Sequence, residues 1–273
     1  MTSPKPPVIT NPWGQLRQFT DARIALGRTG ASLPTQRQLA FQLAHAQARD
    51  AVHQALDVPQ LLQDMEDAGL AKAAEACVLH SEVADRLEYL QRPDLGRRLD
   101  APSRERLKAI ALLQGSGCDI AVVIADGLSS LAVAQNAAPF LVALGSLLGD
   151  GVPTARPVIV QQGRVAIGDE IGEMLGARLV LLLIGERPGL SSPDSMGAYL
   201  TWAPRVGLTD ASRNCVSNIR PAGLPWDEAA AKVHYLITQM QARQLSGVGL
   251  KDETVVAAVG KGMPHGNFLI GQS

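Results

Sequence analysis

The chain has 273 residues, of which 46% are hydrophobic, and a formal net charge of −1. This length is ample for a buried core, and the near-neutral charge offers no basic excess for a phosphate backbone, so no nucleic-acid partner is expected. The wide spacing of Cys77, Cys118 and Cys215, without a C-x-x-C pair, argues against a disulfide framework or a cysteine zinc site. No secretory signal pattern is visible, and the longest aliphatic run, 179–184, is far shorter than the roughly 20 residues that span a bilayer. We therefore expect a cytoplasmic protein that does not enter a membrane.

The first part of the chain is predicted to be an arm followed by helices. Residues 1–31 contain four prolines within the first twelve positions and a glycine turn at 27–30, which predicts an extended arm lying across the body or a partner. Apolar residues then recur at helical spacing, which predicts helices over 32–56, 58–67 and 72–89. Residues 32–115 are accordingly predicted to form a helical N-terminal region.

From Cys118 onwards, short aliphatic runs alternate with helical patterns. The runs "DIAVVIA", "PVIV" and "RLVLLLIG" predict buried strands, and "GAYLTWAP" and "NCVSNI" predict two more. Residues 116–251 are therefore predicted to form an α/β domain with a mostly parallel, doubly wound, Rossmann-like sheet. The glycine-rich tail, 252–273, receives no assignment.

Polar residues follow several of these predicted strands. Asp126 and Ser129 lie in "ADGLSS", Glu186 lies in "GERPGL", and Val165 and Cys215 lie in "GRV" and "RNCVSNI". Open parallel sheets bind ligands at the carboxyl ends of their strands, where the strand order reverses. Four loops from one sheet could therefore line a single crevice.

Each of these residues also has a purely structural interpretation. Asp126 can simply shape a turn and cap the next helix, and Cys215 can be a small apolar residue with an inert thiol. Glu186 and Arg187 can form a solvated turn, although the flanking glycines and proline favour a rigid ligand-binding lip. No dinucleotide fingerprint, P-loop, metal site or hydrolase elbow is found. The residues alone indicate a ligand-binding α/β domain without a self-contained catalytic set, as in one half of an enzyme.

Five motifs follow one another along the chain: FQLAHAQARDAVH (41–53), RPDLGRRL (92–99), ADGLS (125–129), GERPGL (185–190) and RNCVSNI (213–219). Each motif is modest by itself, but five in this order and at this spacing are specific. Together they resemble the small (light) subunit of ethanolamine ammonia-lyase, and the likeness extends from about residue 11 to residue 252.

The resemblance implies an enzyme that converts ethanolamine to acetaldehyde and ammonia by a radical mechanism with adenosylcobalamin. The large subunit would hold the substrate, and this chain would cover the corrin and nucleotide-loop side of the cofactor at the interface of a hetero-oligomer. The family's cofactor contacts fall on Val165, Glu186 and Cys215, and we add Asp126 and Ser129 because of their place at a strand end. No catalytic residue is expected in this chain. The expected location is the cytoplasm, either free or inside a bacterial microcompartment.

Three other functions compete with this one. A stand-alone carrier of cobalamin or a nucleotide would bind its ligand tightly without a partner. A structural subunit would dock the enzyme into a larger shell through the arm. An independent oxidoreductase is disfavoured because the glycine fingerprint is missing.

Overall fold

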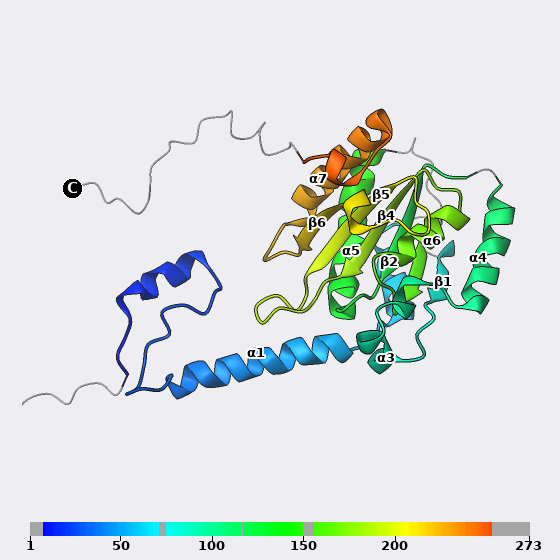
Figure 1. Cartoon of the computed structure of the whole chain (residues 1–273). Coiled ribbons are helices and arrows are strands. Elements are labelled where there is room, and N and C mark those ends of the chain that lie inside the picture. The colour runs from blue at the N-terminus through cyan, green and yellow to red at the C-terminus, as the bar shows by residue number, and fades with distance from the viewer. Residues whose placement is uncertain (1–7, 71–74, 116, 150–155, 253–273) are drawn as a thin grey trace, which may run out of the picture.

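Six strands form one sheet in the order β1-β3-β2-β4-β5-β6 (Figure 1). The structure is a computed structural model that describes residues 8–70, 75–115, 117–149 and 156–252. The strands are β1 (Cys77–His80), β2 (Ile120–Ala125), β3 (Val158–Gln161), β4 (Leu179–Gly185), β5 (Met196–Trp202) and β6 (Arg213–Ile219).

The sheet is mixed. The first four strands in spatial order pair in parallel, whereas β5 and β6 are antiparallel to their neighbours. The α/β class is confirmed, but the Rossmann-like doubly wound pattern does not extend to β5 and β6. The reason is the loop 186–195, which carries no helix and is too short for a parallel crossover, so β5 turns back beside β4.

Helices cover both faces of the sheet. On one face lie α5 (Ser130–Leu148) and α7 (Trp226–Arg243), and on the other lie α4 (Ala101–Gln114) and α6 (Ile167–Met174). Alternate side chains of β4 enter opposite cores, with Leu181 on the α5 side and Leu182 on the α6 side. Every residue of β4 is buried, which explains its unbroken aliphatic sequence.

Helix α5 is the one helix in the described part of the chain that could cross a membrane by length and composition. It packs against α7 and against strands β2, β4 and β5. Its apolar side chains, including the fully buried Phe140, belong to the main core. This packing within the protein accounts for its composition.

The N-terminal region contains a strand that we did not predict. The predicted helix over 72–89 is wrong at 77–80, because these residues form β1 and pair with β3, while 71–74 lie outside the described residues. Helical periodicity over a short apolar stretch does not reveal that a sheet edge is available for pairing. Besides α4, the helices described in this region are α1 (Thr35–His53), α2 (Val58–Asp67) and α3 (Arg86–Gln91), with the 3-10 helices η1 (Pro12–Phe19) and η3 (Leu95–Arg97). Two further 3-10 helices, η4 (Asp210–Ser212) and η5 (Gly247–Gly249), lie near the C-terminal end of the described chain.

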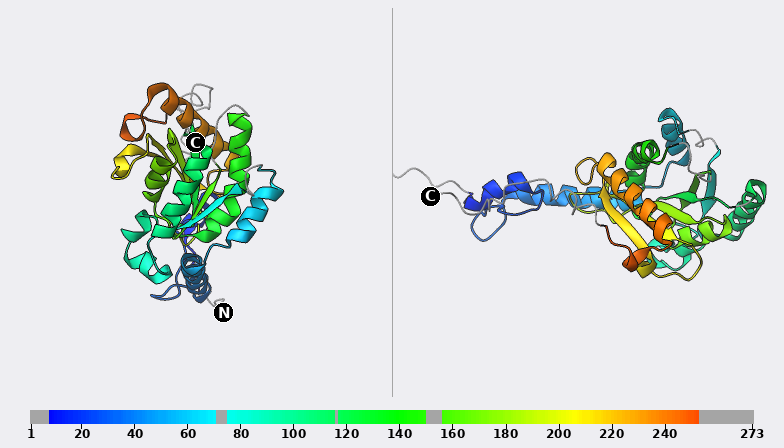
Figure 2. Two further views of the ribbon diagram at one scale, coloured as in Figure 1. Left: turned by 90° about the vertical axis from the view of Figure 1, so that its right-hand side faces the viewer. Right: turned by 90° about the horizontal axis from the view of Figure 1, so that it is seen from above.

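Helix α1 projects from the body and carries the arm at its far end (Figure 2). The described part of the arm is not extended throughout, because it contains η1 and closes on itself through paired backbone bonds between Ile9 and Arg28. The arm contacts the body through Arg23, which donates to the carbonyl oxygen of Leu190 at 3.1 Å. The predicted tail lies, apart from Asp252, outside the described residues.

Candidate functional site

Three of the four predicted site loops meet at one edge of the sheet, whereas RNCVSNI is not a loop but strand β6, with Cys215 inside it opposite Tyr199. Strands β2, β3 and β4 end there together, and the antiparallel register brings Ile219 at the end of β6 to the same edge. The chain leaves β2 through α5 on one face and leaves β3 through α6 on the other. The connections after β2 and β3 thus lie on opposite faces of the sheet. Open α/β sheets bind ligands where the connections change face in this way.

Glu186 follows β4 at this edge and is half-buried. Its Oε2 accepts hydrogen bonds from Ser195 Oγ at 2.5 Å and from the Asn218 amide at 3.3 Å. A Cβ at position 197 would lie 2.9 Å from Oε1, so Gly197 leaves the space that the carboxylate occupies. The carboxylate is therefore held in one orientation before any ligand binds.

An irregularity in β6 aims the Asn218 amide at Glu186. The β5–β6 register shifts between Met196 and Ala198, and Asn218 adopts a left-handed conformation with φ of 62°. Asparagine tolerates this conformation better than most residues do, and such bulges redirect groups next to functional sites. The bulge thus supplies a backbone donor that a regular strand would direct along the ladder.

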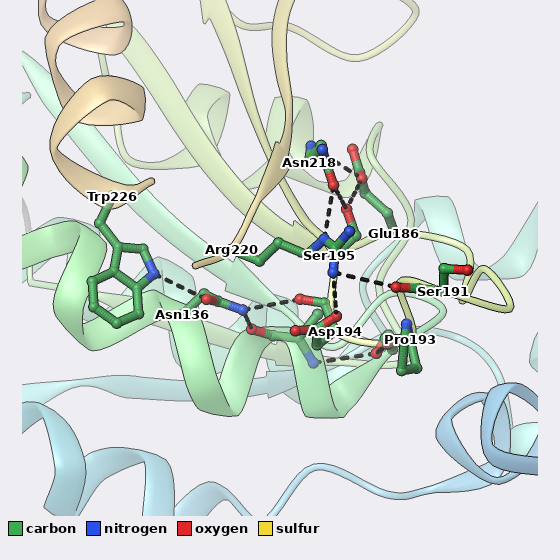
Figure 3. Close-up of polar contacts among 11 residues, drawn as sticks. Asn136, Glu186, Ser191, Pro193, Asp194, Ser195, Asn218, Arg220 and Trp226 are labelled. Carbon is green, nitrogen blue, oxygen red and sulfur yellow. Dashed lines mark hydrogen bonds and ion pairs between the residues drawn. The ribbon is translucent and has the colours of Figure 1, made fainter. Parts of the chain in front are cut away.

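The loop 186–195 is fixed at its base by a polar network (Figure 3). Arg220 donates to the Asn218 side chain at 3.0 Å, and it contacts the Asp194 carboxylate at 3.4 Å. Asn136 of α5 donates to the Asp194 carbonyl oxygen at 3.0 Å and accepts from the Trp226 indole at 2.9 Å. These bonds support the prediction of a rigid lip, while Arg187 at its start is exposed.

Cys215 lies beside Tyr199 on the face of the sheet that α6 covers only in part. Its Sγ is 3.2 Å from Ser217 Oγ, and the residue is exposed overall. The surrounding protein nevertheless desolvates the thiol and raises its pKa above the ordinary value of 9.0, and the charge of Glu186 acts in the same direction. Cys215 and Glu186 therefore share one electrostatic environment, and the thiol stays protonated at neutral pH.

We expect Cys215 to react slowly with iodoacetamide despite its exposure, because the thiolate is the reactive form. The alkylation rate of the peptide containing Cys215, followed by mass spectrometry across pH, should reach half its maximum above pH 9.0. Glutathione in the same tube serves as the unperturbed reference. A midpoint at or below that of glutathione would contradict the raised pKa.

Val165 lies in the turn between β3 and α6, about two strand spacings, or roughly 10 Å, from the end of β4. The Tyr89 hydroxyl donates to the Gly163 carbonyl oxygen at 3.0 Å, and the Arg164 amide donates to the Gly96 carbonyl oxygen at 2.7 Å. Half-buried Val165 packs against the α6-side core and lines a cavity of about 1030 Å³. Glu186 and Cys215 do not line that cavity.

Asp126 is buried, and its carboxylate holds neighbouring loops. Its Oδ1 accepts from the Gly163 amide at 3.2 Å, and its Oδ2 lies 3.7 Å from the Arg86 guanidinium. Burial raises the pKa of this carboxyl, while the backbone amides and Arg86 oppose that shift. Asp126 thereby ties the end of β2 to the turn that carries Val165.

Ser129 is fully buried and serves as the N-cap of α5. Its hydroxyl accepts from the Ala132 amide at 3.2 Å and donates to the Pro193 carbonyl oxygen at 2.7 Å. It therefore fixes both the start of α5 and the base of the lip. The structural interpretation in which Asp126 caps this helix is therefore wrong, because Ser129 is the cap.

Several residues of the site were not predicted from the sequence. Tyr89, Arg86 and Asn136 reach it from distant positions; Tyr89 and its partner Gly163, for example, are 74 positions apart in sequence. No local pattern signals such contacts. Asn218 was among the polar residues of RNCVSNI expected at the crevice, but its left-handed bulge was not predicted.

A comparison with known families shows to which family the chain belongs. Residues 10–251 match the model of the family described as "Ethanolamine ammonia-lyase light chain (EutC)". The chain belongs to this family. The resemblance drawn from the five motifs is therefore confirmed, and the match spans all of the site residues discussed above.

Curated relatives support the same assignment. The chain is 55% identical over 273 residues to the ethanolamine ammonia-lyase small subunit of Azotobacter vinelandii, covering 99% of each chain. It is 53% identical over 270 residues to the small subunit from Pseudomonas putida strain W619, covering 97% of this chain and 98% of the relative. It is also 55% identical over 262 residues to the Pseudomonas aeruginosa LESB58 small subunit, with 95% and 94% covered.

Proposed function

We propose that the chain is the small subunit of an ethanolamine ammonia-lyase and holds adenosylcobalamin against a large subunit. Membership of the light-chain family is the observation that carries this proposal. Val165, Glu186 and Cys215 are proposed to contact the cofactor. Asp126 and Ser129, which we also expected there, are buried, and we propose that they act by holding the loops behind these contacts. The proposed location is the cytoplasm, either free or within a bacterial microcompartment.

The side chains at this edge of the sheet suit a corrinoid ligand. The corrin rim and nucleotide loop carry amides and hydroxyls, which can donate to a carboxylate acceptor such as Glu186. Val165, after β3, and Cys215, in β6, offer apolar or backbone contact on either side of Glu186, each two strand positions from β4. In the turn that carries Val165, Gln162 Oε1 and Arg164 Nε are buried without a hydrogen-bond partner within the described chain.

The role of this chain is proposed to be binding and shielding. Adenosylcobalamin, when bound, supplies the radical that starts the reaction. Among the described residues, Glu186 is held as an acceptor, Cys215 stays protonated, and Asp126 and Ser129 position the loops. We assign hydrogen transfer to none of them. Enclosing the cofactor between two proteins would exclude water from the reacting end.

Ethanolamine deamination tests the proposal with added adenosylcobalamin. The chain and its large subunit should each be inactive alone and active when co-expressed. If the large subunit alone matched the rate of the pair, the small subunit would be reduced to a structural or carrier role. Cobalamin binding by the isolated chain without any effect on turnover would favour the carrier.

Within the active pair, Glu186→Ala should raise the KM for adenosylcobalamin by roughly 10- to 100-fold, the usual cost of a lost charge-assisted hydrogen bond. The kcat at saturating cofactor should change little, because the residue binds and does not react. Glu105→Ala is the matched control, since this carboxylate is 73% exposed on α4. A Glu186→Ala variant with unchanged KM would remove Glu186 from the cofactor site.

A further inference from the structure

The cavity beside Val165 has an unusual charge composition. It lies between the loop 92–98, the start of α6 and the loop 206–210, on the opposite side of α6 from the sheet core. Its lining contains four carboxylates, so six arginines leave two uncompensated positive charges. The six are Arg92, Arg97, Arg98, Arg104, Arg164 and Arg213.

Three of these arginines are neutralised within the chain. Arg92 pairs with Asp94 at 2.7 Å, Arg104 pairs with Glu170 at 2.6 Å, and Arg213 pairs with Asp169. In contrast, Arg97, Arg98 and Arg164 form no ion pair with any carboxylate in the described ranges. The fourth carboxylate, Asp210, also pairs with Arg213. The net positive charge of the cavity is therefore carried by Arg97, Arg98 and Arg164.

The backbone brings two of the three together. The Arg164 amide donates to the Gly96 carbonyl oxygen at 2.7 Å, directly before Arg97 in sequence. A Cβ at Gly96 would lie 2.8 Å from Arg164 Cγ, so the absence of a side chain there allows the close approach. Arg164 is also stacked on Tyr89, with its Cζ 4.0 Å from the ring centroid.

Arg164 has donor capacity that the chain leaves unused. Its Nη2 donates to the Tyr89 carbonyl oxygen at 2.9 Å, whereas its Nε is buried without a partner. Arg97 and Arg98 are exposed at the mouth of the cavity. Guanidinium groups recognise phosphate through paired, charge-assisted hydrogen bonds, and a tetrahedral phosphate can accept from several directions at once.

We propose that this cavity is a phosphate-binding site in which Arg97, Arg98 and Arg164 contact the anion. The phosphate is carried either by the nucleotide loop of a cobalamin or by a free phosphate. The first source rests on the proposed function, because Val165 lines the same cavity. The second source does not depend on a corrinoid.

The test uses the complete complex with its large subunit and three probes: cobinamide, cobinamide phosphate and inorganic phosphate. Corrinoid binding is followed by absorbance and phosphate binding by calorimetry. The variant Arg97→Gln/Arg98→Gln removes two exposed side chains, which spares the packed Arg164. Arg49→Gln/Arg243→Gln is the control with the same change of charge, at two exposed positions outside the cavity lining.

For a cofactor phosphate, the wild-type complex should bind cobinamide phosphate roughly tenfold or more tightly than cobinamide. The cavity variant should lose this preference and keep its affinity for cobinamide, while the control keeps both. For a free phosphate, the two corrinoids should bind equally, and inorganic phosphate should bind the wild type and the control but not the cavity variant.

The proposal is overturned if no phosphate-bearing probe distinguishes the cavity variant from the control. That result is separate from the failure of the proposed function, because cobinamide binding to the wild-type complex reports on the corrinoid site alone. If no corrinoid bound while inorganic phosphate still required Arg97 and Arg98, the phosphate site would stand and the cofactor assignment would fall.

Discussion

Replacing Arg213 with methionine is expected to lower the free energy of unfolding by about 3–5 kcal/mol, the usual cost of removing one partner from a buried ion pair. The Arg213 and Asp169 side chains are only 2% and 3% exposed and pair directly. Arg213 also donates to the Leu208 carbonyl oxygen at 3.2 Å. Without the guanidinium, the Asp169 carboxylate would be buried with no opposite charge. Urea unfolding of the purified chain, followed by circular dichroism, measures the loss.

Two further variants separate charge burial from general damage. The double variant Arg213→Met/Asp169→Leu should recover most of the lost stability, because an apolar pair replaces the ion pair. Asp210→Ala should cost less than about 1 kcal/mol, since that carboxylate pairs with Arg213 at 3.0 Å but is 98% exposed. If Arg213→Met cost no more than Asp210→Ala, the buried pair would not be a main support of this region.

Replacing Gly185 with alanine should cost about 3 kcal/mol, the upper end of the range for overpacked cores. A Cβ at Gly185 would overlap the carbonyl oxygen of Ser129 and would lie 2.6 Å from that of Asp126. Both obstacles are backbone atoms, which cannot rotate away as a side chain can. The strain would fall at the end of β4, directly before Glu186, so weaker cofactor binding should accompany the lower melting temperature.

Gly145→Ala is the matched control for this substitution. Gly145 lies inside α5, and a Cβ there would meet no atom within 4 Å. Alanine in a helix is favoured over glycine by about 0.5–1 kcal/mol, so this variant should be slightly more stable than the wild type. If both alanine variants had the same effect, the close approach at Gly185 would not be the cause of its loss.

The sequence predicted the parts of the fold that depend on local patterns. Strand β4 and the turns after β2, β3 and β4 could be predicted from sequence. A strand buried on both faces is a continuous aliphatic run, and turns favour glycine, proline and small polar residues. The convergence of the strand-end loops followed from the geometry of parallel sheets. The proposed cofactor residues Val165, Glu186 and Cys215 came from family likeness, since nothing in their local pattern singles out a corrinoid.

Other features depend on contacts that no local pattern encodes. Strand β1 is defined by its pairing with β3, some 80 residues away in sequence. The direction of β5 depends on the lack of a crossover helix in the loop before it, and the site is held by long-range partners such as Tyr89 and Arg220. The arginine cavity was not predicted either, because the loops 92–98, 164–170 and 206–213 meet only in the folded chain.

The projecting helix α1 has a consequence for local stability. Its buried residues are Ala44, Ala48 and Ala51, all in the second half, so the first two turns have little tertiary support. A helical segment as short as this unsupported first half is marginal in water, so amide hydrogens near Thr35 should exchange with solvent far faster than those of β4. A steep gradient of exchange protection along a single helix is therefore expected. Slower exchange at the end that carries the arm, on addition of the large subunit, would indicate that the partner binds there.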